Sequence, residues 1–395
     1  MNINHRNIFL HNVAQTSPAP LGLEIVKAEG IHMTDVNGKS YVDLISGISV
    51  SNLGHCHPKV VAAINEQAKT YMHLMVYGEY VQHPQTQYAR LLTSLLPSSL
   101  NSIYFTNSGA EATEGALKLA KRVTGRSEII SFKNAYHGST HGALSVMGNE
   151  EYKNSFRPLL PDITQLEFNN FSQLELITGK TACVIIEPIQ GEAGIHKANT
   201  EYLKALRKKC DETSALLIFD EIQSGFGRTG MLFAFENYNV IPDVLLIAKG
   251  MGGGLPIGAF VASEKLMNCF TSNPVLGHIT TFGGNAVCVA AAKATLETIV
   301  EEKLYLRAEE IEKVLTEVLV HPKIKEVRCS GALCAVEFGD TDLNMKIISS
   351  CIEKGVIVDW FLHCSTAMRI APPLIITNKE LRAALDVIIS AINNS

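Results

Sequence analysis

The chain has 395 residues, of which 46% are hydrophobic and 18% are charged, and this composition predicts one large core or two unequal ones rather than a disordered chain. Its 34 basic and 39 acidic residues give a net charge of -5 without a long run of Lys or Arg. This balance argues against nucleic acid or an anionic membrane as a partner.

The first residues, the lengths of the apolar runs and the cysteines predict where in the cell the protein is located. Residues 1–13 are polar and lack the apolar core of a secretory signal, and no apolar run reaches the roughly 18 residues that span a bilayer. The nine cysteines include no CxxC pair, which is typical of reduced thiols. We therefore predict a cytoplasmic protein. His55 and His57 flank Cys56, but adjacent residues seldom reach one ion and Pro58 is typical of a helix start, so we predict no metal site.

Taken in chain order, the pattern begins with a hairpin-like stretch at residues 24–43. From about residue 101, β-rich runs alternate with amphipathic helices, which predicts an α/β fold with a mostly parallel sheet. The predicted strands are residues 103–106, 128–132, 182–187, 215–220, 244–248 and 259–262, and the clearest helices are 111–123 and 202–212. The C-terminal part contains the elements 304–319, 332–338 and 380–393. We expect residues 1–50 and 291–395 to combine into a smaller α+β domain beside a large domain of residues 51–290.

Ligands of open α/β sheets bind at the carboxyl ends of the strands, so the residues after each predicted strand are the first candidates for a site. After strand 103–106, Ser108, Gly109 and Ala110 form a turn that opens a helix. Its backbone N–H groups and the helix dipole favour a phosphate there. The alternative is that Ser108 is an ordinary helix N-cap.

Two further strand ends carry groups that suit a planar heteroaromatic ligand. After strand 128–132, Tyr136 and His137 lie beside Gly138, which favours stacking on a ring, although a half-buried loop tyrosine is the alternative. Asp220 ends the apolar strand 215–220, where a poorly solvated carboxylate needs a partner. A protonated pyridine nitrogen is one such partner, and a helix N-cap or a structural ion pair is the alternative.

Lys249 follows strand 244–248 directly and precedes a glycine-rich run. Lysine rarely ends a buried strand, and desolvation lowers its pKa toward the neutral amine that forms Schiff bases with aldehydes. The alternative for the glycines is a dinucleotide-binding loop. Their spacing is not G-x-G-x-x-G, however, and Leu255 and Pro256 interrupt the run.

In their order, these motifs closely resemble the class III aminotransferases, a group that includes ornithine, acetylornithine, 4-aminobutyrate, putrescine and diaminopelargonate aminotransferases. The resemblance covers nearly the whole chain. The matching motifs are Gly54-His55-Cys56-His57-Pro58, Ser108-Gly109-Ala110-Glu111-Ala112, Tyr136-His137-Gly138, Glu187-Pro188-Ile189-Gln190-Gly191-Glu192, Asp220-Glu221-Ile222-Gln223-Ser224-Gly225-Phe226-Gly227-Arg228-Thr229-Gly230, Lys249-Gly250, Thr281-Phe282-Gly283-Gly284-Asn285 and Arg369-Ile370-Ala371-Pro372-Pro373. The resemblance implies the aspartate-aminotransferase fold, which is fold type I of the transferases that depend on pyridoxal 5'-phosphate.

The resemblance also implies which residues bind this cofactor. The implied cofactor-binding residues are Ser108, Gly109, Ala110, Tyr136, His137, Glu187, Asp220, Gln223, Lys249 and Thr281. Within this set, Lys249 holds the cofactor as a Schiff base and Asp220 pairs with its ring nitrogen, so these two are the implied catalytic residues. Gln223 lies near the phenolic oxygen. Thr281 reaches the phosphate in the neighbouring subunit, which implies a homodimer with shared active sites.

Three residues bear on the substrates. Arg369 matches the family's arginine for the α-carboxylate of glutamate or 2-oxoglutarate, and Glu192 matches the acid that masks it while a terminal amine binds. A surface ion pair is the alternative for both. At Ser139, the ornithine, acetylornithine and 4-aminobutyrate enzymes have an arginine for a second carboxylate of the donor. We expect a donor without that carboxylate, as for the putrescine and diaminopelargonate enzymes, or another cation such as Arg157.

We therefore predict an enzyme that moves an amino group from a terminal amine of an amino acid or diamine to 2-oxoglutarate by a ping-pong mechanism. The alternatives within the family are acetylornithine, ornithine or 4-aminobutyrate aminotransferase proper, with pyruvate as another acceptor. A pyridoxal-phosphate aminomutase such as glutamate-1-semialdehyde aminomutase is a further hypothesis, because fold and cofactor do not fix the reaction. A non-enzymatic ligand-binding protein is disfavoured by the intact Lys249 and Asp220.

Overall fold

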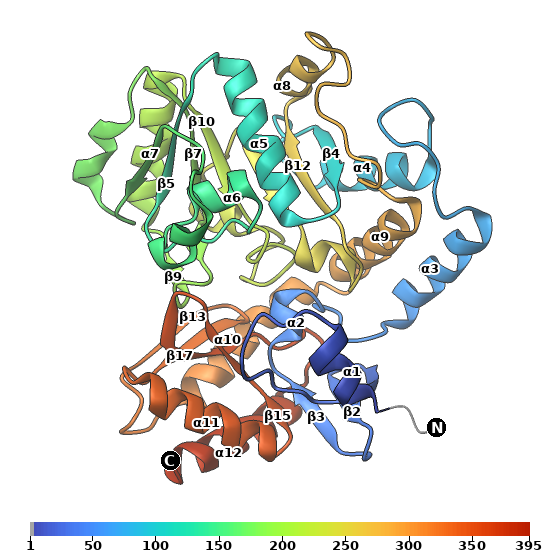
Figure 1. Cartoon of the computed structure of the whole chain (residues 1–395), viewed down its shortest axis with the longest axis vertical. Helices are drawn as coiled ribbons and strands as arrows, with labels where there is room; N and C mark the ends of the chain where they lie inside the picture. The colour runs from blue at the N-terminus through green and yellow to red at the C-terminus, as the bar shows by residue number, and fades with distance from the viewer. Residues whose placement is uncertain (1–3) are drawn as a thin grey trace.

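The largest feature of the fold is a seven-stranded sheet with the strand order β4-β12-β11-β10-β7-β5-β6. In Figure 1 it occupies the upper part of the computed structural model, and the N-terminal and C-terminal elements lie together below it. The structure describes residues 4–395, so the first three residues of the predicted N-terminal segment lie outside the described residues. The predicted α/β class is confirmed.

All strands of the large sheet run in one direction except β12, which is antiparallel to both β4 and β11. The strands are β4 (Ser102–Thr106), β5 (Glu128–Phe132), β6 (Ile163–Leu166), β7 (Thr181–Ile186), β10 (Leu216–Asp220), β11 (Val244–Ile247) and β12 (Gly258–Ala262). The predicted strands match these to within one residue at each end, apart from β6, which is not predicted. Thr164 and Gln165 interrupt the apolar pattern of β6, and it pairs only with β5 at the sheet edge.

Apolar side chains alternate between the two faces of this sheet. In β7, Cys183 and Ile185 belong to the core under helix α5, whereas Val184 and Ile186 belong to the core on the face that α7 covers. The covering helices are α5 (Gly109–Thr124) and α7 (Thr200–Thr213). Because both faces are buried, the strands are continuous apolar runs. The chain leaves this core at the end of each strand, where the polar residues begin.

Two smaller sheets lie below the large one. One contains β1 (Ile25–Glu29), β2 (His32–Asp35), β3 (Ser40–Asp43) and β15 (Val356–Ile357), and the other contains β13 (Glu326–Ser330), β14 (Leu333–Glu337), β17 (Cys364–Ile370) and β16 (Asp359–Phe361). Strand β15 pairs in parallel with β3, so the N-terminal and C-terminal parts of the chain share one sheet. The domain boundaries at residues 50 and 290 stay a prediction.

The other α-helices surround these sheets. They are α1 (His5–Asn12), α2 (Ser46–Ser49), α3 (Pro58–Thr70), α4 (His83–Ser94), α6 (His141–Val146), α8 (Glu264–Met267), α9 (Ala286–Glu301), α10 (Arg307–Val318), α11 (Thr341–Glu353) and α12 (Asn378–Asn393), with a short ribbon β8 (Ile189–Gln190) and β9 (His196–Lys197). Pro58 begins α3 as predicted. Among residues 4–395, no helix is long and apolar enough to cross a membrane, and no three His, Cys, Asp or Glu side chains are grouped to hold a metal ion.

Candidate active site

The strand ends that carry the motifs meet at one edge of the large sheet. Since β4, β5, β7, β10 and β11 run in the same direction, their carboxyl ends open onto one cavity of about 510 Å³. The predicted site residues that line it are Ser108, Gly109, Ala110, Tyr136, His137, Ser139, Glu187, Glu192, Asp220, Gln223 and Lys249. The fold therefore brings together residues that are up to 141 positions apart in the sequence, from Ser108 to Lys249.

The turn between β4 and α5 forms one wall of this cavity. Ser108 is the N-cap of α5, and its Oγ accepts a hydrogen bond from the Glu111 N–H at 3.2 Å, so the N-cap role is confirmed. A Cβ on Gly109 would lie 2.8 Å from Ile222 Cδ1, which shows how closely this turn is packed. The N–H groups of Gly109 and Ala110 begin this 16-residue helix and have no acceptor within it, so they are available to an anion in the cavity.

Asp220 and His137 form a buried ion pair in this cavity. The Asp220 Oδ2 atom lies 2.7 Å from His137 Nδ1, and Asp220 Oδ1 accepts a hydrogen bond from the Ile222 N–H at 3.0 Å. The ion pair that the sequence offers as an alternative for Asp220 is therefore present. Burial lowers the pKa of His137, but the hydrogen bond and charge of Asp220 and the charge of Glu187 raise it more, so the net pKa lies above the ordinary value.

Glu187 follows β7 and is held by the backbone. Its carboxylate accepts hydrogen bonds from the N–H groups of Tyr136 and Gly191, each at 3.0 Å. Burial raises the pKa of Glu187 to about 7, and the charge of Asp220 adds to this, while His137 and the two N–H donors oppose it. Glu187 thereby fixes the backbone next to Tyr136, whose half-buried ring lines the cavity.

Lys249 is separated from the end of β11 by one residue, Ala248, and its backbone has a φ of 43°. This left-handed conformation is uncommon for a residue with a Cβ, and such local strain often accompanies functional sites. Burial lowers the pKa of Lys249 below its ordinary value, although the charges of Glu192, Asp220 and Glu187 oppose that shift. A lowered pKa increases the fraction of neutral, nucleophilic amine.

A second cavity of about 370 Å³ shares Tyr136, Glu192 and Lys249 with the first and also contains Arg369. The Arg369 Nη2 atom donates to Glu192 Oε2 at 2.7 Å, and the two side chains are 4% and 5% exposed. The alternative of a surface ion pair is therefore wrong. Gln223 Nε2 donates to the other Glu192 oxygen at 3.2 Å. Burial raises the pKa of Glu192, but the charges of Arg369 and Lys249 lower it more, so Glu192 is ionised at neutral pH.

Three neighbouring residues of β16 also contact Arg369. Asp359 Oδ1 lies 3.3 Å from Arg369 Nε, the carbonyl of Trp360 accepts from Nη2 at 3.0 Å, and the ring of Phe361 lies 4.6 Å from the guanidinium carbon. Burial raises the pKa of Asp359 to about 7, with Glu192 adding repulsion and Arg369 opposing it. None of the family motifs includes Asp359. The sequence marks Asp359 only as an acidic residue within an apolar stretch, and this pattern does not identify Arg369 as its partner.

The other predicted residues occupy the rim or lie outside the cavities. Ser139 is exposed, and its Oγ lies 3.5 Å from the hydroxyl oxygen of Tyr136. Arg157, the alternative cation, pairs with Glu150 and lines neither cavity. Thr281 is exposed and also lines neither cavity of its own chain.

Known proteins resemble this chain in sequence and in structure. The family model "Aminotransferase class-III" matches residues 13–392. The acetylornithine aminotransferase of Methanocaldococcus jannaschii is 41% identical over 382 residues, which is 93% of each chain, and that of Methanopyrus kandleri is 39% identical over 374 residues, or 94% of each chain. The chain belongs to the class III aminotransferases. A structure of the ornithine aminotransferase from Toxoplasma gondii, which holds pyridoxal 5'-phosphate at partial occupancy, matches it with a TM-score of 0.91 and 31% identity over 98% of this chain and 93% of that one.

This aminotransferase has the predicted fold type I and depends on pyridoxal 5'-phosphate. Its larger cavity fits that cofactor chemically. The helix N-terminus at residues 108–110 suits a phosphate, the buried carboxylate of Asp220 suits a protonated ring nitrogen, and Lys249 suits an aldehyde. His137 Nε2 is buried and has no partner among the described residues, which leaves a polar atom of this aminotransferase for a bound molecule.

The Asp220–His137 ion pair gives a test of the site that does not depend on turnover. Asp220→Asn keeps the side-chain size but removes the charge, so we expect the pKa of His137 to fall below its ordinary value because burial then dominates. An NMR titration of the ¹⁵N-histidine-labelled protein without cofactor measures this pKa. Glu187→Gln is the matched control and is expected to lower the pKa less. An unchanged pKa in Asp220→Asn would contradict the ion pair as its cause.

Proposed function

We propose that this aminotransferase moves the amino group of a terminal amine, from an amino acid or a diamine, to 2-oxoglutarate by a ping-pong mechanism. The observation that carries the proposal is the buried Arg369–Glu192 pair beside Lys249. A 2-oxo acid has a carboxylate next to its reacting carbon and needs Arg369, whereas a terminal amine has none there and leaves the ion pair closed. One cavity then serves both substrates in turn.

When bound, pyridoxal 5'-phosphate supplies an aldehyde that captures amines and a ring that withdraws electrons. We assign residues 108–110 to its phosphate and the ring of Tyr136 to its face. We assign Asp220 to the ring nitrogen, where its charge keeps a proton in place, and His137 to orienting Asp220. Gln223 is assigned to the phenolic oxygen.

Lys249 has two roles in this proposal. It holds the cofactor between turnovers, and as a free amine it moves a proton between the substrate carbon and the cofactor. The lowered pKa of Lys249 suits both roles, because a base works best when its pKa lies near the pH at which it operates. The nearby carboxylates of Glu192 and Glu187 limit how far this pKa falls.

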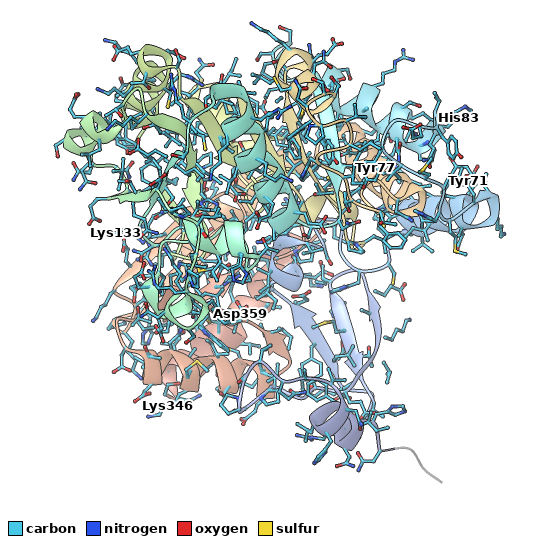
Figure 2. All side chains as sticks on the ribbon, turned by 45° about the horizontal axis from the view of Figure 1, so that its top comes forward. Tyr71, Tyr77, His83, Lys133, Lys346 and Asp359 are labelled. Carbon is cyan, nitrogen blue, oxygen red and sulfur yellow. The ribbon has the colours of Figure 1, made fainter. Side chains whose placement is uncertain are left out.

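Lys249→Ala is expected to reduce turnover by a factor on the order of 10³ and to abolish covalent attachment of the cofactor. Borohydride reduction followed by peptide mass spectrometry identifies the lysine that carries it. Lys133→Ala is the control, because this lysine is exposed and pairs with Glu167 at the surface (Figure 2). Trapping of the cofactor on a lysine other than Lys249 would refute the assignment.

We further propose a homodimer with shared active sites, which two adjoining loops of exposed apolar residues support. The exposed apolar side chains of residues 71–82 are Met72, Leu74, Met75, Tyr80 and Val81, and those of residues 271–285 are Val275, Leu276, Ile279 and Phe282. The loops touch, since Asn285 Nδ2 donates to the Met72 carbonyl at 3.0 Å. Figure 2 shows Tyr71 and Tyr77 on this side of the molecule. A contiguous apolar patch is typical of an interface.

Thr281→Ala tests the shared site, because Thr281 lies in the second of these loops and lines neither cavity of its own chain. We expect cofactor affinity to fall about tenfold, as for loss of one hydrogen bond to a charged group. Titration of the cofactor-free protein measures this affinity, and Ser272→Ala in the same loop is the control. A monomer in sedimentation analysis that binds the cofactor with full affinity would refute the shared site.

Two donor classes are compatible with a terminal amine, and different observations favour each. The names of the relatives favour N-acetylornithine, which carries a carboxylate at the end distant from its reacting amine. The lack of a cation near Ser139 favours a diamine or another donor without that carboxylate. Among the described residues that line the two cavities, the only lysine and arginine are Lys249 and Arg369. We retain the second class as the proposed donor.

A donor panel with 2-oxoglutarate or pyruvate, read as glutamate or alanine formed, tests this choice. We expect wild-type kcat/KM to be higher for diamines than for N-acetylornithine and 4-aminobutyrate. Ser139→Arg should improve the carboxylated donors relative to a diamine by about tenfold or more, since a charge-assisted hydrogen bond contributes about 1.5–3 kcal/mol. Ser139→Gln, which is polar but uncharged, is the control. A wild-type preference for N-acetylornithine would establish the first class instead.

A further inference from the structure

Asp359 stands beside Arg369 because of strand register. The two residues are Cα partners in the antiparallel pair of β16 and β17, so their side chains point to the same face of that sheet. Asp359 lies where the C-terminal elements meet the part of the chain above them (Figure 2). It lines the smaller cavity together with Lys249 and Tyr136. The carboxylate of Asp359 therefore faces the smaller cavity from a paired position in β16.

The two acids that contact Arg369 differ in how they are held. Glu192 belongs to the turn between β8 and β9, and Gln223 Nε2 and the Leu362 N–H also donate to its carboxylate. Glu192 therefore keeps other partners when a ligand carboxylate takes its place at Arg369. The backbone of Asp359 is paired with Arg369 in the sheet, and its Oδ1 atom lies 3.3 Å from Arg369 Nε, close enough for an ion pair but without the angle of a hydrogen bond. After Glu192 has left Arg369, Asp359 remains beside the guanidinium and carries a negative charge at pH values above about 7.

Two N–H-bearing atoms of the Arg369 guanidinium are available to hydrogen-bond a ligand. Arg369 is 3% exposed, and neither Nε nor Nη1 has a hydrogen-bond acceptor among residues 4–395. An incoming carboxylate can use Nη1, but it then shares the guanidinium with the like charge of Asp359. This repulsion affects a carboxylate attached next to the reacting carbon, whereas it does not affect a CH₂–NH₂ group, which brings no charge to Arg369.

Resting on the proposed function, we propose that Asp359 is a specificity-determining residue. As a second, fixed counter-ion, it weakens the binding of α-carboxylates to Arg369 and thereby favours terminal amines over α-amino acids as donors. It acts through Arg369 and is a positioning residue, not a catalytic one. The charged groups that face Asp359 are Arg369 from β17, Glu192 from the turn after β8 and Asp43 from β3.

A binding measurement tests this inference independently of turnover. Trp360, the only tryptophan of the chain, lines the same cavity next to Asp359, so its fluorescence reports on ligands there. We would titrate the holoenzyme in its lysine-bound form with 2-oxoglutarate, which binds but cannot react without an amino group on the cofactor. At about pH 8, Asp359→Asn should lower the Kd about tenfold, and Asp359→Glu, which keeps the charge, should retain the wild-type Kd.

The pH dependence and the donor preference complete the test. The wild-type Kd should rise as pH increases through about 7, where Asp359 gains its charge, and this rise should be absent in Asp359→Asn. The ratio of kcat/KM for L-alanine over a diamine should also increase about tenfold in Asp359→Asn.

An unchanged or higher Kd in Asp359→Asn would overturn the inference, as would equal loss of affinity in Asp359→Asn and Asp359→Glu. Failure of the proposed function is a separate outcome. If the wild-type holoenzyme formed no glutamate from any terminal amine while Asp359→Asn still tightened 2-oxoglutarate binding, the proposed function would be wrong and the role of Asp359 toward Arg369 would stand.

Discussion

The buried ion pair between Arg369 and Glu192 connects two parts of the chain that are 177 positions apart. Glu192 extends from the turn between β8 and β9, and Arg369 extends from β17 in one of the smaller sheets. Neither charge is tolerated alone at this depth, because removal of one partner from a buried pair costs about 3–5 kcal/mol. The pair joins the C-terminal sheet to the turn between β8 and β9, and both of its members line the smaller cavity.

Around Lys249, the site contains more acids than bases. Burial raises the pKa of Glu187 and of Asp359 to about 7, while Arg369 and Lys249 hold the pKa of Glu192 low. Such divergent pKa values among neighbouring carboxyl groups are typical of active sites, since each group then keeps a different protonation state at one pH. A cationic cofactor ring and a protonated amine are the groups that this balance of charge accommodates best.

In the proposed function, selection of substrates depends on charge at two ends of the cavity. At the rim, the uncharged Ser139 occupies the position where several members of the family have an arginine. Near Lys249, Arg369 is shared by Glu192 and Asp359. We propose that both features reduce the attraction of the site for carboxylates, one at the distal end of a substrate and one next to its reacting carbon. The relatives of about 40% identity carry the name of a carboxylated donor, so these two positions are where a difference in substrate would arise.

Local patterns of residues predict six of the seven strands of the large sheet and the polar residues at their ends. Residues 244–248 are an uninterrupted apolar run that ends at the polar residue Lys249. Such a pattern is local, so it predicts a buried strand without knowledge of the rest of the fold. The order of the motifs was enough to identify the family and the cofactor. Strand β6 is not predicted, because Thr164 and Gln165 interrupt its apolar pattern.

The pairing of buried charges depends on contacts between distant parts of the chain. The pairing of His137 with Asp220 spans 83 positions, the pairing of β3 with β15 joins the two ends of the chain, and Asp359 meets Arg369 through the register of β16 and β17. Register and helix packing set these contacts. A local pattern of apolar and polar residues says which side chains are buried, but it does not say which strand will lie opposite, and so it cannot name the partner of a buried charge.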